Sequence, residues 1–361
     1  MSFTFEARTL LELGKELISS DEVALYELIK NAVDARSPRV EILVNCQLSY
    51  TDFKEAVARL EEEKRPLPEL ADYVQSCLID NDDPNAARLM QSLRAATNAG
   101  EFLTALHSGY IAMNTIEVRD TGDGMSLTDL RDVFLRVGTR SRRTENLAGA
   151  RNLGDKGIGR LSAMRLGERL RVKTSRAGET HWNLLDIDWT LFSHDSRMSI
   201  DEITIEPLIG EEKFSPEEQG TSILISDLRG DWTEVRFTDI LQGRIARMVD
   251  PFVPGAANKL MVPRHNGNRI NIPSIPTALL DCAHAVCHVK FYMDGDEPVL
   301  SGIIDYRYRH RSIGINARGA QVYSLAQNGI KRRAKRGHAA FRERGGYALM
   351  PTLSVIWQIE S

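Results

Sequence analysis

Three polar side chains near the start of the sequence have types and spacing suited to nucleotide chemistry: Glu27, Asn31 and Asp34. At about 100° per residue, these positions fall within about 60° of one another on a helix. The apolar residues of the opposite face are Leu25, Leu28, Ile29, Ala32 and Val33. A carboxylate and an amide one turn apart can hold a water molecule beside a hard cation, which hydrolysis of a magnesium nucleotide requires. The alternative is an amphipathic surface helix with an ordinary polar face.

A second candidate motif, Asp120-Thr-Gly122-Asp-Gly124-Met125, directly follows a predicted strand. Its two glycines permit a tight turn and the close approach of a flat ligand. An aspartate at the end of a strand can accept a hydrogen bond from an exocyclic amine. The same residues also describe a polar turn, so the motif alone leaves both interpretations open.

Two further glycine motifs follow. The first consists of Gly154, Asp155, Lys156, Gly157, Ile158 and Gly159. It precedes a predicted helix, where bare N–H groups can bind phosphates and Lys156 adds positive charge. It lacks the spacing of a Walker loop and the context of a Rossmann fingerprint, and the alternative is a glycine-rich loop at a helix start. The second motif, Gly220-Thr221, opens a predicted strand and says little alone.

Alternating helices and strands must position these motifs. Predicted helices cover 20–36, 51–108, 127–135, the stretch from Gly159 to Gly167, and 235–249. Predicted strands cover 40–44, 115–119, 170–174 and 220–227, with several more in 181–206. Ser20 and Asp21 favour the start of the first helix, and Ser37-Pro38 ends it. Prolines predict breaks in 51–108 near 66–68 and at 84, and the stretch 138–159 has the composition of a mobile loop.

In this order the four motifs resemble those of the GHKL ATPase superfamily, which includes gyrase B, heat-shock ninety chaperones, histidine kinases, MutL and MORC. Residues 27–35 match its N box, 120–125 its first glycine box, 154–159 its second, and 220–221 its closing Gly-Thr pair. The resemblance covers roughly residues 10–230. It implies a Bergerat fold, a two-layer α/β sandwich with a mixed, largely antiparallel sheet and helices on one face.

The resemblance also implies roles for the N box. Glu27 would be the general base that orients and polarises the attacking water. Asn31 would hold Mg²⁺, and Asp34 would be a supporting polar contact at the nucleotide.

The glycine boxes would bind the rest of the ATP molecule. Asp120 would accept a hydrogen bond from the adenine amino group, with Thr221 assisting through water. Gly122, Gly124 and Met125 would shape the base site. The stretch 138–159 would be the ATP lid, and its expected ligand contacts are Gly154, Lys156, Gly157, Ile158 and Gly159.

The branch of the superfamily follows from two segments. Glu27 argues against a histidine kinase, because histidine kinases lack a glutamate at this position of the N box. Residues 159–167 look most like MORC proteins, and residues 27–31 resemble MutL and the chaperones. The resemblance therefore implies slow ATP hydrolysis coupled to lid closure and dimerisation, in a DNA-associated or defence-related ATPase. The alternatives are a chaperone-like ATPase acting on protein clients, an ATP-binding module without turnover, and a scaffold.

The expected domains are an ATP-binding domain over 1–235, a transducer-like α/β domain of ribosomal S5 type over 236–330, and a basic, then apolar, tail over 331–361. The segment 51–108 is expected to be a helical insert. Between 331 and 344, seven of fourteen residues are Lys or Arg. Such a basic run is typical of a solvent-exposed face, and the alternative is a nucleic-acid contact. MORC, MutL and the chaperones continue well past a transducer, so we expect a fragment or a short version.

Composition excludes some classes of protein. The 361 residues contain 46 Lys and Arg against 50 Asp and Glu, a net charge of −4, which excludes nucleic-acid binding through bulk positive charge but not through a local patch. No apolar run approaches the roughly 20 residues of a membrane helix, and no signal-peptide core stands at the start, so we expect a cytoplasmic protein.

Four cysteines are too few for a disulfide framework. Cys282, His284, Cys287 and His288 could ligate zinc, but their segment has the pattern of a strand, with Cys287 on the opposite face. A strand without metal is favoured, and a zinc site is the alternative.

Overall fold

The computed structural model describes residues 18–134, 162–192, 203–249, 253 and 255–273, together with strands between residues 285 and 360. The chain divides into two compact units. The first comprises Met1–Asp250 and Gly255–Pro273, and the second comprises Pro251–Pro254 and Ser274–Ser361. Within the described residues, no helix combines the length and the apolar character needed to span a bilayer.

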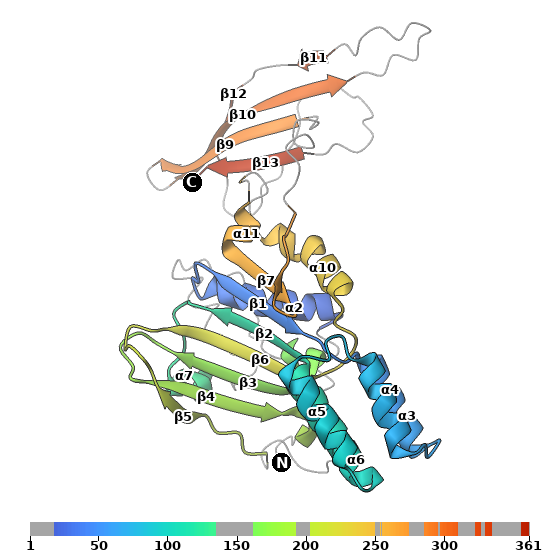
Figure 1. The fold of residues 1–361 in the computed structure, drawn as a ribbon. Coiled ribbons are helices and arrows are strands. Elements are labelled where there is room, and N and C mark those ends of the chain that lie inside the picture. The colour runs from blue at the N-terminus through green and yellow to red at the C-terminus, as the bar shows by residue number, and fades with distance from the viewer. Residues whose placement is uncertain are drawn as a thin grey trace, which may run out of the picture. The chain divides into compact units, whose positions relative to one another are not determined.

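In the described part of the first unit, eight strands form one mixed sheet (Figure 1). In spatial order they are β5 (Leu208–Glu212), β4 (His181–Asp188), β3 (Gly167–Ser175), β6 (Gly220–Leu228), β2 (Thr115–Asp120), β1 (Val40–Asn45), β7 (Met261–His265) and β8 (Asn268–Arg269). Strands β1 and β7 run parallel, and the other neighbouring pairs are antiparallel. The prediction of a mixed, largely antiparallel sheet is confirmed.

Helices α2 (Asp21–Asp34), α9 (Ala163–Leu166) and α10 (Glu234–Gly243) pack on one face of this sheet. Their apolar side chains share one buried core with alternate residues of the central strands. The opposite face of β2 and β6 is polar, since Glu117 pairs with Arg119 and accepts a hydrogen bond from Ser222. One apolar and one polar face make the unit a two-layer α/β sandwich, as the sequence predicts.

Helix α2 begins where the sequence predicts. Ser20 caps it by accepting a hydrogen bond from Val23 N at 3.2 Å. Its buried side chains are Ala24, Leu25, Leu28, Ile29 and Ala32, which include four of the five predicted apolar residues. The fifth, Val33, is partly buried against the same core. The chain leaves the helix through Arg36, which adopts a left-handed φ of 60°, just before Ser37-Pro38.

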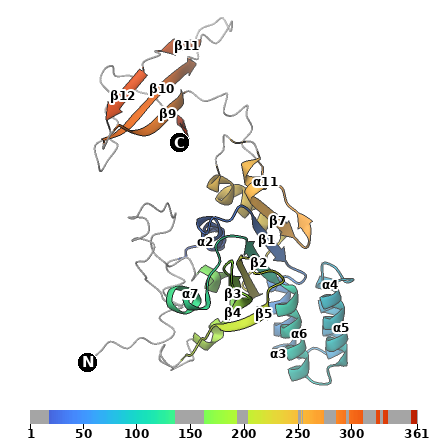
Figure 2. The same cartoon turned by 90° about the vertical axis from the view of Figure 1, so that its left-hand side faces the viewer.

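The segment 51–108 folds as a helical insert whose helices lie side by side (Figures 1 and 2). They are α3 (Tyr50–Glu61), α4 (Leu67–Cys77), α5 (Pro84–Ala95) and α6 (Ala99–Met113). Prolines mark the predicted breaks, since Pro66 precedes α4 and Pro84 begins α5. Buried residues such as Leu93, Phe102 and Leu106 form a core distinct from that of the sheet. The insert therefore has its own apolar centre.

The insert is attached to the end of β6. Tyr110 on α6 donates a hydrogen bond from its hydroxyl to the Leu228 carbonyl at 2.9 Å. His107, also on α6, lies 3.1 Å from an Asp227 oxygen, and burial raises the pKa of that carboxyl. These contacts hold α6 against the strand whose other end carries the Gly-Thr pair.

Most predicted elements coincide with observed ones. The helix predicted over 127–135 is α7 (Leu127–Asp129) continued by the π-helical turn η1 (Leu130–Phe134), and that over 235–249 is α10 followed by the 3₁₀ turn η5 (Ile245–Met248). After β4 comes the 3₁₀ turn η3 (Trp189–Phe192) rather than another strand. The edge strand β5 begins at Leu208, beyond the predicted range 181–206. The sequence does not predict this strand because its residues are mostly exposed and do not alternate between apolar and polar.

The first unit extends beyond residue 235, where the sequence suggests a domain boundary. Strand β7 pairs in parallel with β1, with Val40 opposite Met261. Helices α10 and α11 (Ala256–Leu260) also belong to this unit, and Phe237 and Leu241 join its core. The residues after 235 thus add new elements to an existing core. The transducer interpretation of 236–330 stays a prediction.

The described residues of the second unit form a separate sheet. Its strands are β9 (Ala285–Asp294), β10 (Glu297–Arg309), β11 (Val322–Leu325), β12 (Gly329–Arg333) and β13 (Val355–Glu360). The spatial order is β11-β10-β9-β13, with β12 also paired to β10. Strand β9 contains Cys287 and His288, which agrees with the predicted strand, whereas Cys282 and His284 lie outside the described residues. The segment 331–361, expected as a tail, supplies part of β12 and all of β13, which pairs in parallel with β9.

Asp21 ties together the helices that cover the first sheet. Its carboxylate lies 3.0 Å from Arg165 of α9 and accepts a hydrogen bond from Arg236 of α10 at 2.5 Å. The Asp21 side chain is 16% exposed, against 34% and 38% for the two arginines. Partial burial reduces solvent screening, so this pair of contacts stabilises more than an exposed ion pair would.

Replacing Asp21 by Asn should lower the free energy of unfolding of the first unit by about 1–3 kcal/mol, because two half-buried guanidinium groups lose their counter-charge. Urea titration followed by tryptophan fluorescence would measure this, since buried Trp232 lies 5.2 Å from the Arg236 guanidinium. Asp123→Asn is the matched control: Asp123 pairs with Arg36 at 2.6 Å, but their side chains are 48% and 81% exposed. Equal losses in both variants would contradict the role of Asp21.

Candidate nucleotide site

Asp120 ends β2, and backbone donors fix its carboxylate. Its Oδ1 atom accepts a hydrogen bond from Gly122 N at 2.9 Å, and the Thr221 N–H of β6 donates to the same carboxylate. Asp120 and Thr221 lie opposite each other in the β2–β6 ladder. Burial raises the pKa of Asp120 to about 6, while the two hydrogen bonds act in the opposite direction. A carboxylate held in so unfavourable an environment is typical of a binding site.

The turn after β2 packs against the end of α2. A Cβ atom on Gly122 would lie 2.3 Å from the Ala35 carbonyl oxygen, and Asp123 N donates a hydrogen bond to that oxygen at 3.0 Å. Gly124 has a φ of +66°, and a Cβ atom there would lie 1.9 Å from the Ser175 carbonyl oxygen of β3. Only glycine fits these two positions. The first glycine box is therefore in contact with the residue that follows the predicted N-box helix.

Glu27, Asn31 and Asp34 are half-buried on α2, on the side away from its fully buried residues. At 1.5 Å per residue, Asn31 is about 6 Å and Glu27 about 12 Å along the helix from Ala35. The Glu27 carboxylate lies 3.4 Å from Lys30 Nζ, which restrains it at the helix surface. Counted from the turn that holds Asp120, the three polar residues of the helix therefore follow in the order Asp34, Asn31 and Glu27.

Hydrogen bonds connect the residues beside Asp120 to one another. They are Met125, Thr174 and Thr221. Met125 N donates a hydrogen bond to Thr174 Oγ1 at 2.9 Å, and Met125 O accepts one from Asn183 Nδ2 at 3.2 Å. Thr174 Oγ1 lies 3.0 Å from Thr221 Oγ1. The structure thus brings Met125 and Thr221, predicted from separate motifs, into one hydrogen-bonded group.

The second glycine box falls outside the described residues. Its members are Gly154, Lys156, Gly157, Ile158 and Gly159. The predicted lid over 138–159 lies outside them too, and both assignments stay predictions.

A comparison with models of protein families matches residues 105–221 to the family described as histidine kinase-, DNA gyrase B-, and HSP90-like ATPase. Residues 105–221 therefore match a GHKL-type ATPase domain. The matched part of the GHKL domain runs from α6 to Thr221 and includes Asp120 and the turn after it, whereas α2 lies before it. No curated protein matches the sequence. The family match supports ATP binding as the general activity of the GHKL domain.

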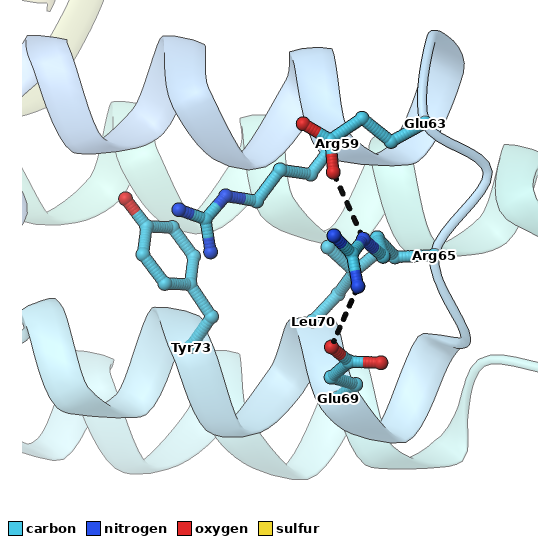
Figure 3. Close-up of a pocket in the computed structure, with 6 residues that line it drawn as sticks. All are labelled: Arg59, Glu63, Arg65, Glu69, Leu70 and Tyr73. Carbon is cyan, nitrogen blue, oxygen red and sulfur yellow. Dashed lines mark hydrogen bonds and ion pairs between the residues drawn. The ribbon is translucent and has the colours of Figure 1, made fainter.

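A pocket of about 180 Å³ lies in the insert, between α3 and α4 (Figure 3). Arg65 bridges Glu63 at 2.9 Å and Glu69 at 3.4 Å, and the Arg59 guanidinium stacks 3.9 Å from the centre of the Tyr73 ring. These acidic and basic groups compensate one another, so the pocket offers no fixed excess charge to a phosphate. It belongs to the insert and includes none of the predicted site residues.

Sequence reasoning missed two residues of the candidate site. Thr174 continues the inward-facing alternation of Leu170 and Val172 on β3, and a hydroxyl in such a series needs a buried partner. That pattern is the signal that could have identified it. Ser37 accepts a hydrogen bond from Thr121 N at 2.9 Å and so joins the exit of α2 to the glycine turn. Before Pro38 it resembles an ordinary helix-ending residue.

The raised pKa of Asp120 predicts how stability depends on pH. Its folded-state pKa of about 6 lies above its ordinary value of 3.8, so the native state holds this proton more tightly than the unfolded chain does. The stabilising contribution is fully present below about pH 4 and is lost as pH rises through 6, by at most about 3 kcal/mol. The melting temperature of the ligand-free chain should therefore fall relative to that of Asp120→Asn between pH 5 and pH 8. A difference between the two proteins that does not change with pH would contradict this environment for Asp120.

Proposed function

We propose that the chain is a magnesium-dependent ATPase in which Asp120 binds the adenine amine and Glu27 activates the attacking water. The observation that carries this proposal is the half-buried carboxylate of Asp120, which the N–H groups of Gly122 and Thr221 hold. The turn that follows it packs against Ala35 at the end of α2. Such a carboxylate is costly to the fold unless a ligand uses it. The family match over residues 105–221 supports the same assignment.

The positions of the groups along α2 support a division of labour. The base would lie at the Asp120 end, beside Gly122, Gly124 and Met125, with Thr221 assisting. The phosphates would extend along the helix toward Glu27, about 12 Å from Ala35. There the Glu27 carboxylate accepts a proton from the attacking water and orients it in line with the γ-phosphate. Asp34, one residue before Ala35, supports the nucleotide at the Asp120 end.

The residues on α2 fit a magnesium ion. Asn31 offers an amide oxygen, and its neighbours Glu27 and Asp34 are also oxygen donors, which are the ligands that Mg²⁺ prefers. In the described part of the chain no cluster of three His, Cys, Asp or Glu side chains forms a protein-only metal site. A site with one or two protein oxygens completed by substrate phosphates agrees with both facts. When bound, the ion would neutralise charge developing on the phosphates.

The biological setting that we propose is a cytoplasmic, DNA-associated or defence-related ATPase of MORC or MutL type. ATP would close the lid over 138–159 and favour a homodimer, and hydrolysis would release it. The basic run from Lys331 to Arg344 supports a nucleic-acid partner. The alternative is a chaperone-like ATPase, in which unfolded protein rather than DNA would stimulate turnover.

Glu27→Gln should reduce ATP turnover by about 100-fold or more, because the amide cannot accept the proton of the attacking water. The affinity for ATP should change by less than about threefold, since Glu27 lies at the phosphate end of the helix. Phosphate release and calorimetric titration of ATP with Mg²⁺ would measure the two quantities separately.

Glu22→Gln is the matched control on the same helix. Glu22 accepts a hydrogen bond from Arg244 N at 3.2 Å and has no proposed role at the nucleotide, so turnover should be retained. Equal, background rates of phosphate release in the native chain and in Glu27→Gln would remove the hydrolase proposal and leave an ATP-binding module. Failure of the native chain to bind ATP would contradict the assignment of Asp120 as well.

A further inference from the structure

Thr174 lies at the centre of the hydrogen bonds beside Asp120. It is fully buried, one residue before the end of β3. Its Oγ1 atom accepts a hydrogen bond from Met125 N at 2.9 Å, donates one to the Gly220 carbonyl at 2.9 Å, and lies 3.0 Å from Thr221 Oγ1. One hydroxyl thus connects the turn after β2 with the first two residues of β6.

Proton counting fixes the direction of the contact between the two hydroxyls. A threonine hydroxyl has one proton and two lone pairs. Thr174 uses its proton on the Gly220 carbonyl, and one lone pair accepts from Met125 N. Its remaining lone pair can only accept, so Thr221 must be the donor in the Thr174–Thr221 hydrogen bond. Every hydrogen-bonding site of Thr174 is then satisfied, as a fully buried hydroxyl requires.

This direction determines what the Thr221 hydroxyl can offer a ligand. Its proton is held by Thr174, so it presents lone pairs only. Asp120, directly opposite in the ladder, is a carboxylate and also presents lone pairs only. Two neighbouring acceptors complement a hydrogen-bond donor, and they repel a carbonyl oxygen. In purines the 6-amino group of adenine is a donor, whereas a 6-oxo group is an acceptor.

We propose that Thr174 is a positioning residue that holds the Thr221 hydroxyl as an acceptor and thereby makes the base site selective for 6-amino over 6-oxo purines. The inference rests on the proposed function, in which Asp120 and Thr221 face the base, and it takes the Thr221 hydroxyl to contact the base directly rather than through the water that the resemblance implies. It adds a residue that touches no ligand and acts through its neighbour. Replacing Thr174 should therefore change which purine base the site prefers.

The test compares the dissociation constants of ATP and inosine triphosphate (ITP) for the full chain. The two bases differ in the 6-substituent and in the proton that hypoxanthine carries on N1. Thr174→Val keeps the shape of the side chain but removes the hydroxyl. The Thr221 proton then loses its acceptor and can turn to donate to a 6-oxo group. The preference for ATP over ITP should fall by about tenfold, the effect of one hydrogen bond, while Thr174→Ser should retain it.

Thr221→Val supplies a second arm that does not depend on the folding of Thr174→Val. Removing the Thr221 hydroxyl should lower the preference by a similar factor, and adding Thr174→Val to it should produce no further change. A native preference that persists in Thr174→Val or in Thr221→Val overturns this inference alone. A native chain that binds ATP and ITP equally contradicts the role of Asp120 and the proposed function with it.

Discussion

The central constraint on the first unit is a carboxylate, that of Asp120, which the fold removes from most of its water. Asp120 satisfies that constraint because two backbone N–H groups, from Gly122 and Thr221, replace lost hydration. Both donors are set by the fold: one by the turn that closes on Ala35, the other by the register of β2 against β6. A slip of one residue in that register would turn the facing side chains to the opposite side of the sheet.

The same constraint explains how the surrounding elements are arranged. Helix α2 ends at the turn that holds Asp120, and its first turn is held by Arg165 and Arg236, so both ends of the helix are anchored. The insert adds its own core and attaches near Leu228, seven residues along β6 from Thr221, or about 23 Å at 3.3 Å per residue. A large helical addition can therefore be accommodated without disturbing the base site.

The sequence predicts the polar face of α2 and the motif around Asp120 because each has a local signature: a periodicity of 3.6 in the first, and paired glycines after a strand ending in an acid in the second. The prediction of the sandwich comes from the resemblance of the four motifs to the GHKL superfamily. The sequence misses Thr174 because a buried hydroxyl is defined by partners more than 40 residues away in the chain. It also places a boundary at residue 235 because nothing in the residues of β7 announces parallel pairing with β1. The second glycine box and the lid lie outside the described residues, so their contribution rests on motif alone.

A crystal structure of the full chain with a non-hydrolysable ATP analogue and Mg²⁺ tests the central claim most directly. The account predicts that the purine amine lies within hydrogen-bonding distance of an Asp120 oxygen, that the phosphates run along α2, and that the metal ion contacts Asn31. Nucleotide bound elsewhere, or Asp120 covered by protein side chains with no space for a base beside it, would contradict it.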